Sequence, residues 1–300
     1  MFHYFLYGSH VISDMFFFQL IPYEVGCTCT QPEFGITELT AAELTDCGAG
    51  SYIRFGKRET VISGEDCILK IYDGNRIGYH CREAETAQAM LPHFILGVGI
   101  ALLYYQRNLI AVHGSCIYDS QGAVLVCGKS GAGKSTAAAM LLERGYRFMA
   151  DDITLVAPLQ DNVIHAYSAF PYQKLCPDRE TELKAGIRLL GEDNKYMIPY
   201  QQGLPTMPVR LRAIIILTLS SSGQLHTEEV EGVQKVYACQ DIMFLSTILK
   251  RELHTVQQGH AIMQLAAQTP LFHIARPQGI DSRADVVNAI IEILSQKQGR

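Results

Sequence analysis

The sequence predicts an α/β fold, with a mostly parallel or mixed sheet flanked by helices, preceded by a small β-rich domain. The first observation is an apolar run, Ala123 to Cys127, followed at once by a glycine-rich turn and a helical segment. The second is a series of short aromatic and β-branched segments over residues 1 to 82. The third is the length of 300 residues, which favours two domains. We place them at residues 1–90 and 91–300.

Composition narrows the class of protein. The formal net charge is −5, 48% of the residues are hydrophobic, and no Lys or Arg precedes Arg54. An acidic chain without a basic cluster disfavours nucleic acid and anionic membranes as partners. Nine cysteines without a C-x-x-C pair indicate neither a zinc site nor a disulfide framework, and favour the cytoplasm. The apolar stretch Met15 to Ile21 is too short to span a bilayer.

The β-rich part is expected to contain strands separated by turns. Asp73-Gly74 is a hairpin signal between two of them. The polar stretch from Gln31 to Ser51 is expected to be a loop or a short surface helix. The three aromatics Phe16 to Phe18 are expected to lie in a strand, with core on one face and an interface on the other. The expected strands are His3–Tyr7, Val11–Leu20, Tyr52–Phe55, Thr60–Ile62, Cys67–Tyr72 and Arg76–Cys81.

A helix is expected over Glu83 to Arg107, broken or started at Pro92, and its apolar part should be buried between the domains or beneath the second sheet. Residues 171–208 carry five prolines and many charges, which makes this excursion a candidate substrate or lid region. Helices are expected over Ser135–Arg144, Gln234–Ala267 (one or two) and Ser282–Gln296. Further strands are expected at Leu109–Tyr118, Ala123–Cys127, Arg147–Ala150, Ile153–Val156, Val163–Ala169, Val209–Ser220, Leu225–Val230 and Leu271–Ala275.

The turn from Gly128 to Thr136 has the pattern G-x-x-x-x-G-K-[ST]. In such a loop backbone N–H groups and the N-terminus of the next helix surround phosphate oxygens. Lys134 is expected to reach the β- and γ-phosphates, and the Ser135 hydroxyl to ligate Mg²⁺. The residues expected to bind the nucleotide are Ser130, Gly131, Ala132, Gly133, Lys134, Ser135 and Thr136.

Residues before and after the loop indicate which reaction the bound nucleotide would undergo. His113-Gly114 precedes the loop, and Asp151-Asp152 ends a strand after it. The carboxyl ends of parallel strands meet at one crevice of a doubly wound sheet. Phosphoryl transfer to a hydroxyl needs a carboxylate for the hydroxyl proton, oxygen ligands around Mg²⁺ and cations for the γ-phosphate. The pattern therefore favours a kinase that uses ATP and Mg²⁺.

These residues resemble HPr kinase/phosphorylase, a bacterial serine kinase. The resemblance lies in the His-Gly pair, the loop G-K-S-G-A-G-K-S and the run R-G-Y-R-F-M-A-D-D, in that order. It implies a serine kinase with Asp151 as the base toward the acceptor hydroxyl, His113 as its electrostatic partner, Lys134 as a catalytic cation and Asp152, with Ser135, at the metal. Spacing leaves open which of Asp151 and Asp152 takes which role.

The sequence also departs from the regulatory enzymes. Thr136 stands where they usually carry Glu, and the downstream E-[IV]-R-G-x-G segment is missing. The β-rich N-terminal part resembles the kinases of peptide-tailoring clusters instead. The resemblance implies as acceptor the C-terminal serine of a lasso-peptide precursor, or a small protein. The family is oligomeric, which leaves a homo-oligomer open.

Two other functions stay open on the sequence: a bifunctional HPr kinase/phosphorylase, and a nucleotide-responsive sensor that uses its N-terminal domain as an interaction module. Lys174 and Lys195 are candidate phosphate clamps, with a solvated surface charge as the alternative. Arg276, at the end of the last strand, either reaches the crevice or lies on the surface.

Overall fold

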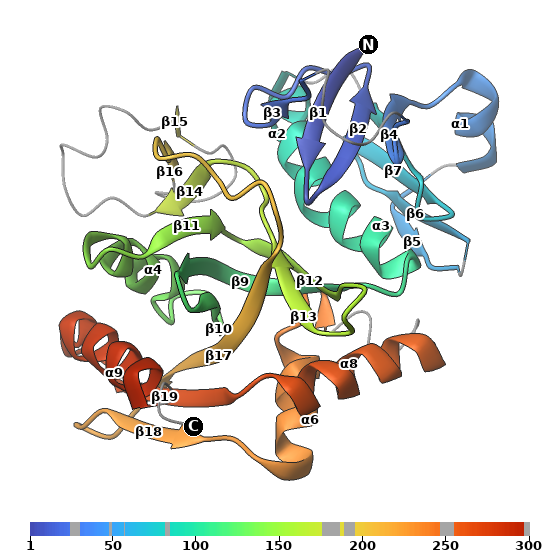
Figure 1. Ribbon diagram of the computed structural model, residues 1–300. Coiled ribbons are helices and arrows are strands. Elements are labelled where there is room, and N and C mark those ends of the chain that lie inside the picture. Colours follow the sequence, from blue (N-terminus) through green and yellow to red (C-terminus); the bar gives the residue numbers. More distant parts are fainter. Residues whose placement is uncertain are drawn as a thin grey trace.

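The computed structural model describes residues 1–24, 31–47, 50–56, 58–81, 85–175, 187–188, 196–246 and 255–296. Figure 1 shows two sheets with a helical segment between them. The chain is a mixed α/β protein with a β-rich N-terminal part, which confirms the predicted fold class. Lys195, one of the two candidate clamps, lies outside the described residues.

The N-terminal sheet has eight strands. Two of its pairings, β2 with β4 and β4 with β8, are parallel, and the others are antiparallel. Its order is β3 (Ile21–Pro22), β1 (Phe2–Leu6), β2 (Ser9–Ser13), β4 (Phe34–Glu38), β8 (Arg76–Cys81), β7 (Cys67–Tyr72), β6 (Glu59–Ser63) and β5 (Tyr52–Arg54).

The hairpin at Asp73-Gly74 is confirmed. Both residues have positive φ, 46° and 65°, and they join β7 to β8. The turn is closed by the N–H of Asn75, which donates to the carbonyl of Tyr72, and its two central residues need the left-handed backbone that Asp and Gly adopt at low cost.

Two expectations for this part need correction. The segment Gln31 to Ser51 contains α1 (Ala41–Cys47), as expected, but also the strand β4, which lies inside the sheet. Phe16 to Phe18 lie outside any strand, because β2 ends at Ser13. Phe17 is buried, whereas Phe16 and Phe18 are exposed. This alternation of buried and exposed side chains therefore arises in a turn and not in a strand.

The helical connection between the sheets consists of α2 (Glu85–Phe94), η1 (Ile95–Gly99) and α3 (Ile100–Gln106). Pro92 lies inside α2, and the π-helical turn η1 follows it directly. Helix α3 contacts β7 and β8 of the first sheet and β9 of the second. Its residues Ile100 to Tyr105 are all buried, as expected for a helix covered on both sides. The proposed boundary at 90/91 falls within α2 and stays a prediction.

Replacing Leu103 by Ala should destabilise the protein strongly. Leu103 is fully buried in the core that this helix shares with both sheets. We expect the free energy of unfolding to fall by roughly 2–5 kcal/mol, because the substitution removes apolar contacts and leaves a cavity. Urea denaturation measures this loss. Met263→Ala, in an exposed position of another helix, is the control and should change the free energy of unfolding by less than about 0.5 kcal/mol. If both variants lost the same free energy of unfolding, the helix would not share a core with the two sheets.

The second sheet is mixed and carries the glycine-rich loop. Strand β10 (Gly122–Gly128) pairs parallel with β17 (Val209–Ser220), which pairs parallel with β19 (Leu271–Pro277). All residues from Ala123 to Cys127 are fully buried, which explains their continuous apolar run. The remaining strands are β9 (Ile110–Asp119), β12 (Ile153–Pro158), β13 (Ile164–Tyr167), β18 (His226–Glu229) and β11 (Arg147–Ala150), the last of which pairs with β9.

Helices α4 (Lys134–Glu143) and α9 (Arg283–Gln296) share one apolar core with β10, β17 and β19. The expected end of the first helix at Gly145 is confirmed, because this residue has φ +95° and its N–H donates to Leu142. The segment expected to form one or two helices contains α6 (Gly232–Asp241) and α8 (Val256–Gln268). Helix α8 begins at a capping box formed by Thr255 and Gln258.

The proline-rich excursion contributes a small third sheet. Its described strands are β14 (Tyr172–Leu175), β16 (Tyr196–Pro199) and β15 (Ile187–Arg188), paired in the order β14, β16, β15. Strand β14 contacts α4, the helix behind the glycine-rich loop. The excursion therefore begins beside that loop.

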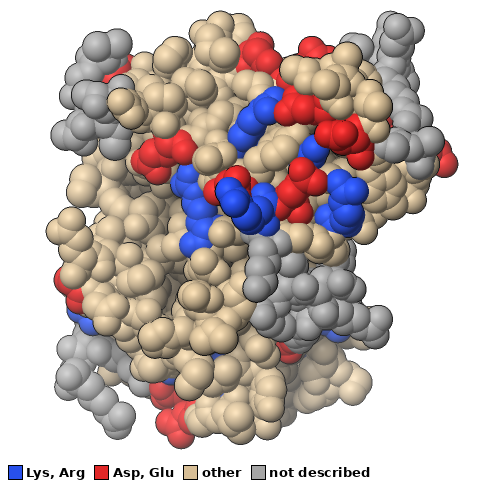
Figure 2. Space-filling view, turned by 90° about the vertical axis from the view of Figure 1, so that its right-hand side faces the viewer, with Lys and Arg blue, Asp and Glu red and all other residues tan. Residues whose placement is uncertain are grey.

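One segment of the described chain, Ala89–Gln106, is long and apolar enough to cross a membrane by length and composition, and 56% of it is buried inside the protein. Lys and Arg alternate with Asp and Glu on the face drawn in Figure 2. Ion pairs such as Arg58–Asp73 and Arg76–Glu43 join the two signs in the N-terminal part. The cytoplasmic location and the absence of nucleic-acid or membrane partners stay predictions.

Candidate active site

The glycine-rich loop connects β10 to α4. Gly128, Gly131 and Gly133 have φ of 143°, 81° and 99°, a backbone region that glycine adopts without strain. A Cβ atom on Gly128 would lie 2.3 Å from the carbonyl oxygen of Leu217. The loop is therefore held closely against β17, and its first glycine is required by both conformation and space.

Lys134 and Ser135 start helix α4, so their side chains lie at its positive end. Lys134 Nζ donates to the carbonyl oxygen of Lys129 at 3.3 Å, within the loop. Ser135 Oγ lies 3.4 Å from Asp151 Oδ1. The loop hydroxyl and the carboxylate thus lie within hydrogen-bonding distance of each other.

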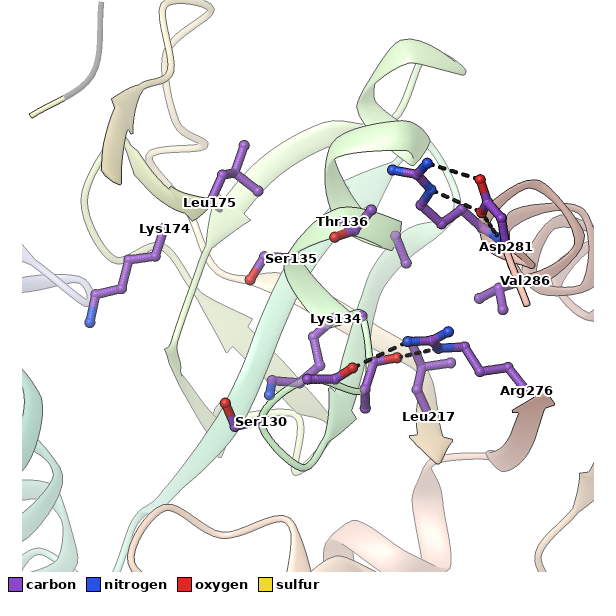
Figure 3. A pocket seen from close by; sticks show the side chains of 15 residues that line it. Ser130, Lys134, Ser135, Thr136, Lys174, Leu175, Leu217, Arg276, Asp281 and Val286 are labelled. Atoms are coloured by element: carbon purple, nitrogen blue, oxygen red, sulfur yellow. Dashed lines mark hydrogen bonds and ion pairs between the residues drawn. The ribbon is translucent and has the colours of Figure 1, made fainter. Parts of the chain in front are cut away.

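Arg276 reaches the loop, which decides between the two alternatives for this residue. Its Nε donates to the carbonyl of Ala132 at 2.9 Å and its Nη2 to that of Gly131 at 3.2 Å (Figure 3). It comes from β19, two strands away from β10. The guanidinium fastens the loop by its carbonyls and adds positive charge beside its N–H groups.

Asp151 is buried behind the loop. Its Oδ1 accepts from Ser115 Oγ at 2.5 Å and contacts Ser135, while its Oδ2 accepts from the backbone N–H of Lys174 at 2.8 Å. Burial raises the pKa of this carboxyl, and the hydrogen bonds from Ser115 and Lys174 counteract the shift. Both carboxylate oxygens of Asp151 thus accept hydrogen bonds from other parts of the protein. This arrangement suits a residue that orients the loop serine.

Asp152 points elsewhere, because the chain turns sharply at this residue. Its φ is +70°, in the left-handed region that Asp adopts more readily than most residues other than Gly and Asn. Its Oδ1 lies 3.6 Å from His113 Nδ1, and its Oδ2 accepts from Lys174 Nζ at 2.6 Å. Its side chain is 28% exposed, whereas Asp151 is buried. Two neighbouring carboxylates therefore have different surroundings.

The structure explains why a glycine follows His113. His113 opposes Ile153 across β9 and β12, next to the aspartate pair. A Cβ atom on Gly114 would lie 2.8 Å from the carbonyl oxygen of Val126 and 2.9 Å from Cys127 Sγ. The glycine allows β9 to approach the strand that feeds the loop, and the histidine is thereby brought to the aspartates.

Lys174 lies at the centre of the site. Its ammonium contacts Asp152 Oδ2 and, at 2.6 Å, His93 Nε2, and its side chain is 9% exposed. The sequence marked Lys174 as one of two candidate clamps but did not single out His93 or Phe244. His93 lies in a helix that precedes every motif, and Phe244 lies in an irregular segment after α6. Neither position carries a sequence signal.

Two of the cavities at these residues are lined by Lys134 and Ser135. The first, about 470 Å³, runs along the loop to Arg276, Asp281 and Arg283. The second, about 390 Å³, contains the aspartate pair and is bounded by the end of α2, η1 and Phe244. They share four lining residues, Ser130, Lys134, Ser135 and Lys174. The loop thus separates a long groove from a more compact cavity with the carboxylates.

The oxygen atoms present suit Mg²⁺. It prefers carboxylates, hydroxyls, water and substrate phosphates over a cage of protein ligands. The Ser135 hydroxyl with the carboxylates behind it is such a set. Within the described ranges no group of three or more His, Cys, Asp or Glu could hold a metal. A Mg²⁺ here would be held by Ser135, with the aspartates through its water shell, together with phosphate oxygens.

Comparison with known proteins identifies the central segment. Residues 107–175 match the family model of the HPr Serine kinase C-terminal domain. The putative HPr kinase/phosphorylase 2 of Oceanobacillus iheyensis is 46% identical over 64 residues, 20% of this chain and 21% of that protein. The HPr kinase/phosphorylase of Mycoplasmopsis pulmonis is 38% identical over 60 residues, 20% of this chain and 19% of that protein. The chain thus matches about a fifth of the length of each relative.

Among solved structures, the Hpr(Ser) kinase/phosphatase from Coxiella burnetii is similar with a TM-score of 0.28 and 12% identity, over 63% of this chain and 93% of that one. The matched segment 107–175 contains His113, the glycine-rich loop, both aspartates and Lys174. This central segment is similar to the HPr Serine kinase C-terminal domain.

Proposed function

We propose that this protein is an ATP- and Mg²⁺-dependent kinase that transfers the γ-phosphoryl group to a serine hydroxyl of a peptide or small protein. The observation that carries the proposal is the pair Asp151-Asp152 at the loop. One carboxylate is bound to the loop serine, and the other faces a cavity beside His113 and Lys174.

The geometry favours a specific division of roles. Asp152 accepts the proton of the serine hydroxyl, while the hydroxyl oxygen forms a bond to the γ-phosphorus and the bond to the β-phosphate oxygen breaks, leaving ADP. His113, 3.6 Å away, stabilises the charge of Asp152. Asp151 orients Ser135, the hydroxyl that would hold a bound Mg²⁺. This exchanges the roles of the two aspartates relative to the sequence-based interpretation.

Cations surround the place where charge develops. Lys134, at the start of α4, and Lys174, at the boundary of both cavities, supply positive charge for the γ-phosphate, and Arg276 holds the loop. Mg²⁺, when bound, offsets the negative charge of the phosphates. Positioning and electrostatics supply most of the rate enhancement in phosphoryl transfer.

The preferred acceptor is the C-terminal serine of a lasso-peptide precursor. Support for it comes from the sequence: Thr136, the missing downstream segment and the β-rich N-terminal part. The second candidate acceptor is the protein HPr, and the names of the two relatives favour it.

Mass spectrometry of acceptors tests the proposal. The full-length protein is mixed with Mg-ATP and peptides that end in Ser or in Ala, and separately with HPr. We expect a gain of one phosphate on the Ser peptides only. A gain on HPr alone would favour the second acceptor. ADP production without any phosphorylated acceptor would contradict the kinase proposal and favour the nucleotide-responsive sensor.

A further inference from the structure

We infer that the cavity between η1 and the glycine-rich loop receives the acceptor, and that the helix face His93, Phe94, Gly97 and Val98 determines which acceptors fit. The inference rests on the proposed function. It adds the place and the chemical class of the acceptor: a segment whose hydroxyl residue has uncharged, apolar neighbours.

The cavity has polar and apolar lining residues. Asp152, His113 and Lys134 are the groups at which the hydroxyl and the γ-phosphate must meet. Phe94, Val98 and Phe244 also line it, and the ring of Phe244 lies 5.8 Å from that of His113 between centroids. Its volume of about 390 Å³ is within the range of small-ligand sites and leaves room for a few acceptor atoms beyond the hydroxyl. A charged acceptor side chain placed against these apolar residues would lose its hydration.

The helix face follows from spacing. Residues 93 and 97, 94 and 97, and 94 and 98 are three or four positions apart, which places the four residues on one side of a helix. The π-helical turn at Ile95–Gly99 coincides with this face. Such turns occur frequently at functional sites, because the extra residue changes the direction of the side chains.

His93 fixes this face over the site. Its Nε2 lies 2.6 Å from Lys174 Nζ, which also contacts Asp152. The wall of the cavity and the proposed base therefore share one lysine. A substitution in the wall can therefore change the position of Asp152 through Lys174.

Gly97 leaves the space that the acceptor needs. A Cβ atom built on this residue meets nothing within 4 Å. The wall also lies outside residues 107–175, the segment that matches the known family. The proposed acceptor wall thus comes from a different part of the chain than the aspartates and the glycine-rich loop.

The test places larger side chains at position 97, where they would project into the cavity. Wild type, Gly97→Ala and Gly97→Leu are given Mg-ATP and a library of pentapeptides that end in Ser and whose other four positions, the flanks, are degenerate. We expect wild type to prefer apolar over acidic flanks by at least about 10-fold, which corresponds to about 1.4 kcal/mol. Gly97→Leu should lose at least 10-fold of this transfer and Gly97→Ala less, with the Kd for Mg-ATP unchanged within twofold.

Gly259→Leu is the matched control. Gly259 is also helical, in α8, and a Cβ atom there also meets nothing within 4 Å. It should retain wild-type transfer, and all variants should unfold at the same urea concentration. Wild-type transfer by Gly97→Leu, or a preference for charged flanks, would overturn this inference alone. No transfer by wild type to any library peptide would overturn both this inference and the proposed peptide-kinase function.

Discussion

Asp152→Asn should lower the rate of phosphoryl transfer by about 10²-fold or more, while the Kd for Mg-ATP changes little. The amide keeps the size of the side chain but cannot accept the hydroxyl proton. Asp152 faces the cavity that contains His113 and Lys174, so the loss should appear in kcat. Single-turnover kinetics with a saturating acceptor measure it.

Asp151→Asn is the contrasting variant. Asp151 is buried and its two oxygens hold Ser115, Ser135 and the N–H of Lys174. The amide replaces one acceptor oxygen by a donor, so we expect weaker Mg-ATP binding and a lower free energy of unfolding. If Asp151→Asn binds Mg-ATP normally yet transfers no phosphate, and Asp152→Asn is active, the original assignment of Asp151 as the base is right.

Lys174→Met should lower phosphoryl transfer by about 10²-fold, because it removes a preorganised cation at the boundary of the two cavities. It also removes the ammonium that lies 2.6 Å from Asp152 Oδ2. Isothermal titration with Mg-ATP separates a binding defect from a transfer defect. The expected pattern is a large fall in kcat with a smaller rise in Kd.

Two further variants make this prediction specific. Lys174→Arg keeps the charge and should restore part of the transfer. Lys235→Met, in α6, removes a lysine that lines neither cavity and should behave as wild type. If Lys174→Met retains wild-type kcat, Lys174 is a structural partner of Asp152 and His93 only.

The N-terminal part shows where sequence reasoning fails. Strand β4 begins within a polar, acidic stretch, and its place between β2 and β8 depends on pairings with residues far apart in the chain. Phe16 to Phe18 have high strand propensity, yet the chain turns there. Propensity is a weak guide where long-range pairing and packing determine the backbone.

The sequence by itself determined the glycine-rich loop, the strand and helix on either side of it, and the set His113, Asp151 and Asp152. These depend on local requirements: positive φ at glycines, a continuous apolar strand and a capped helix. Only the tertiary structure decided which aspartate faces His113, that Arg276 fastens the loop, and that His93 reaches Lys174. One reason is that a single turn of the backbone decides which way each of two adjacent side chains points. The other is that these contacts join residues 81 to 145 positions apart in the chain. Such contacts arise from the order of the strands and the packing of the helices, which no local pattern encodes.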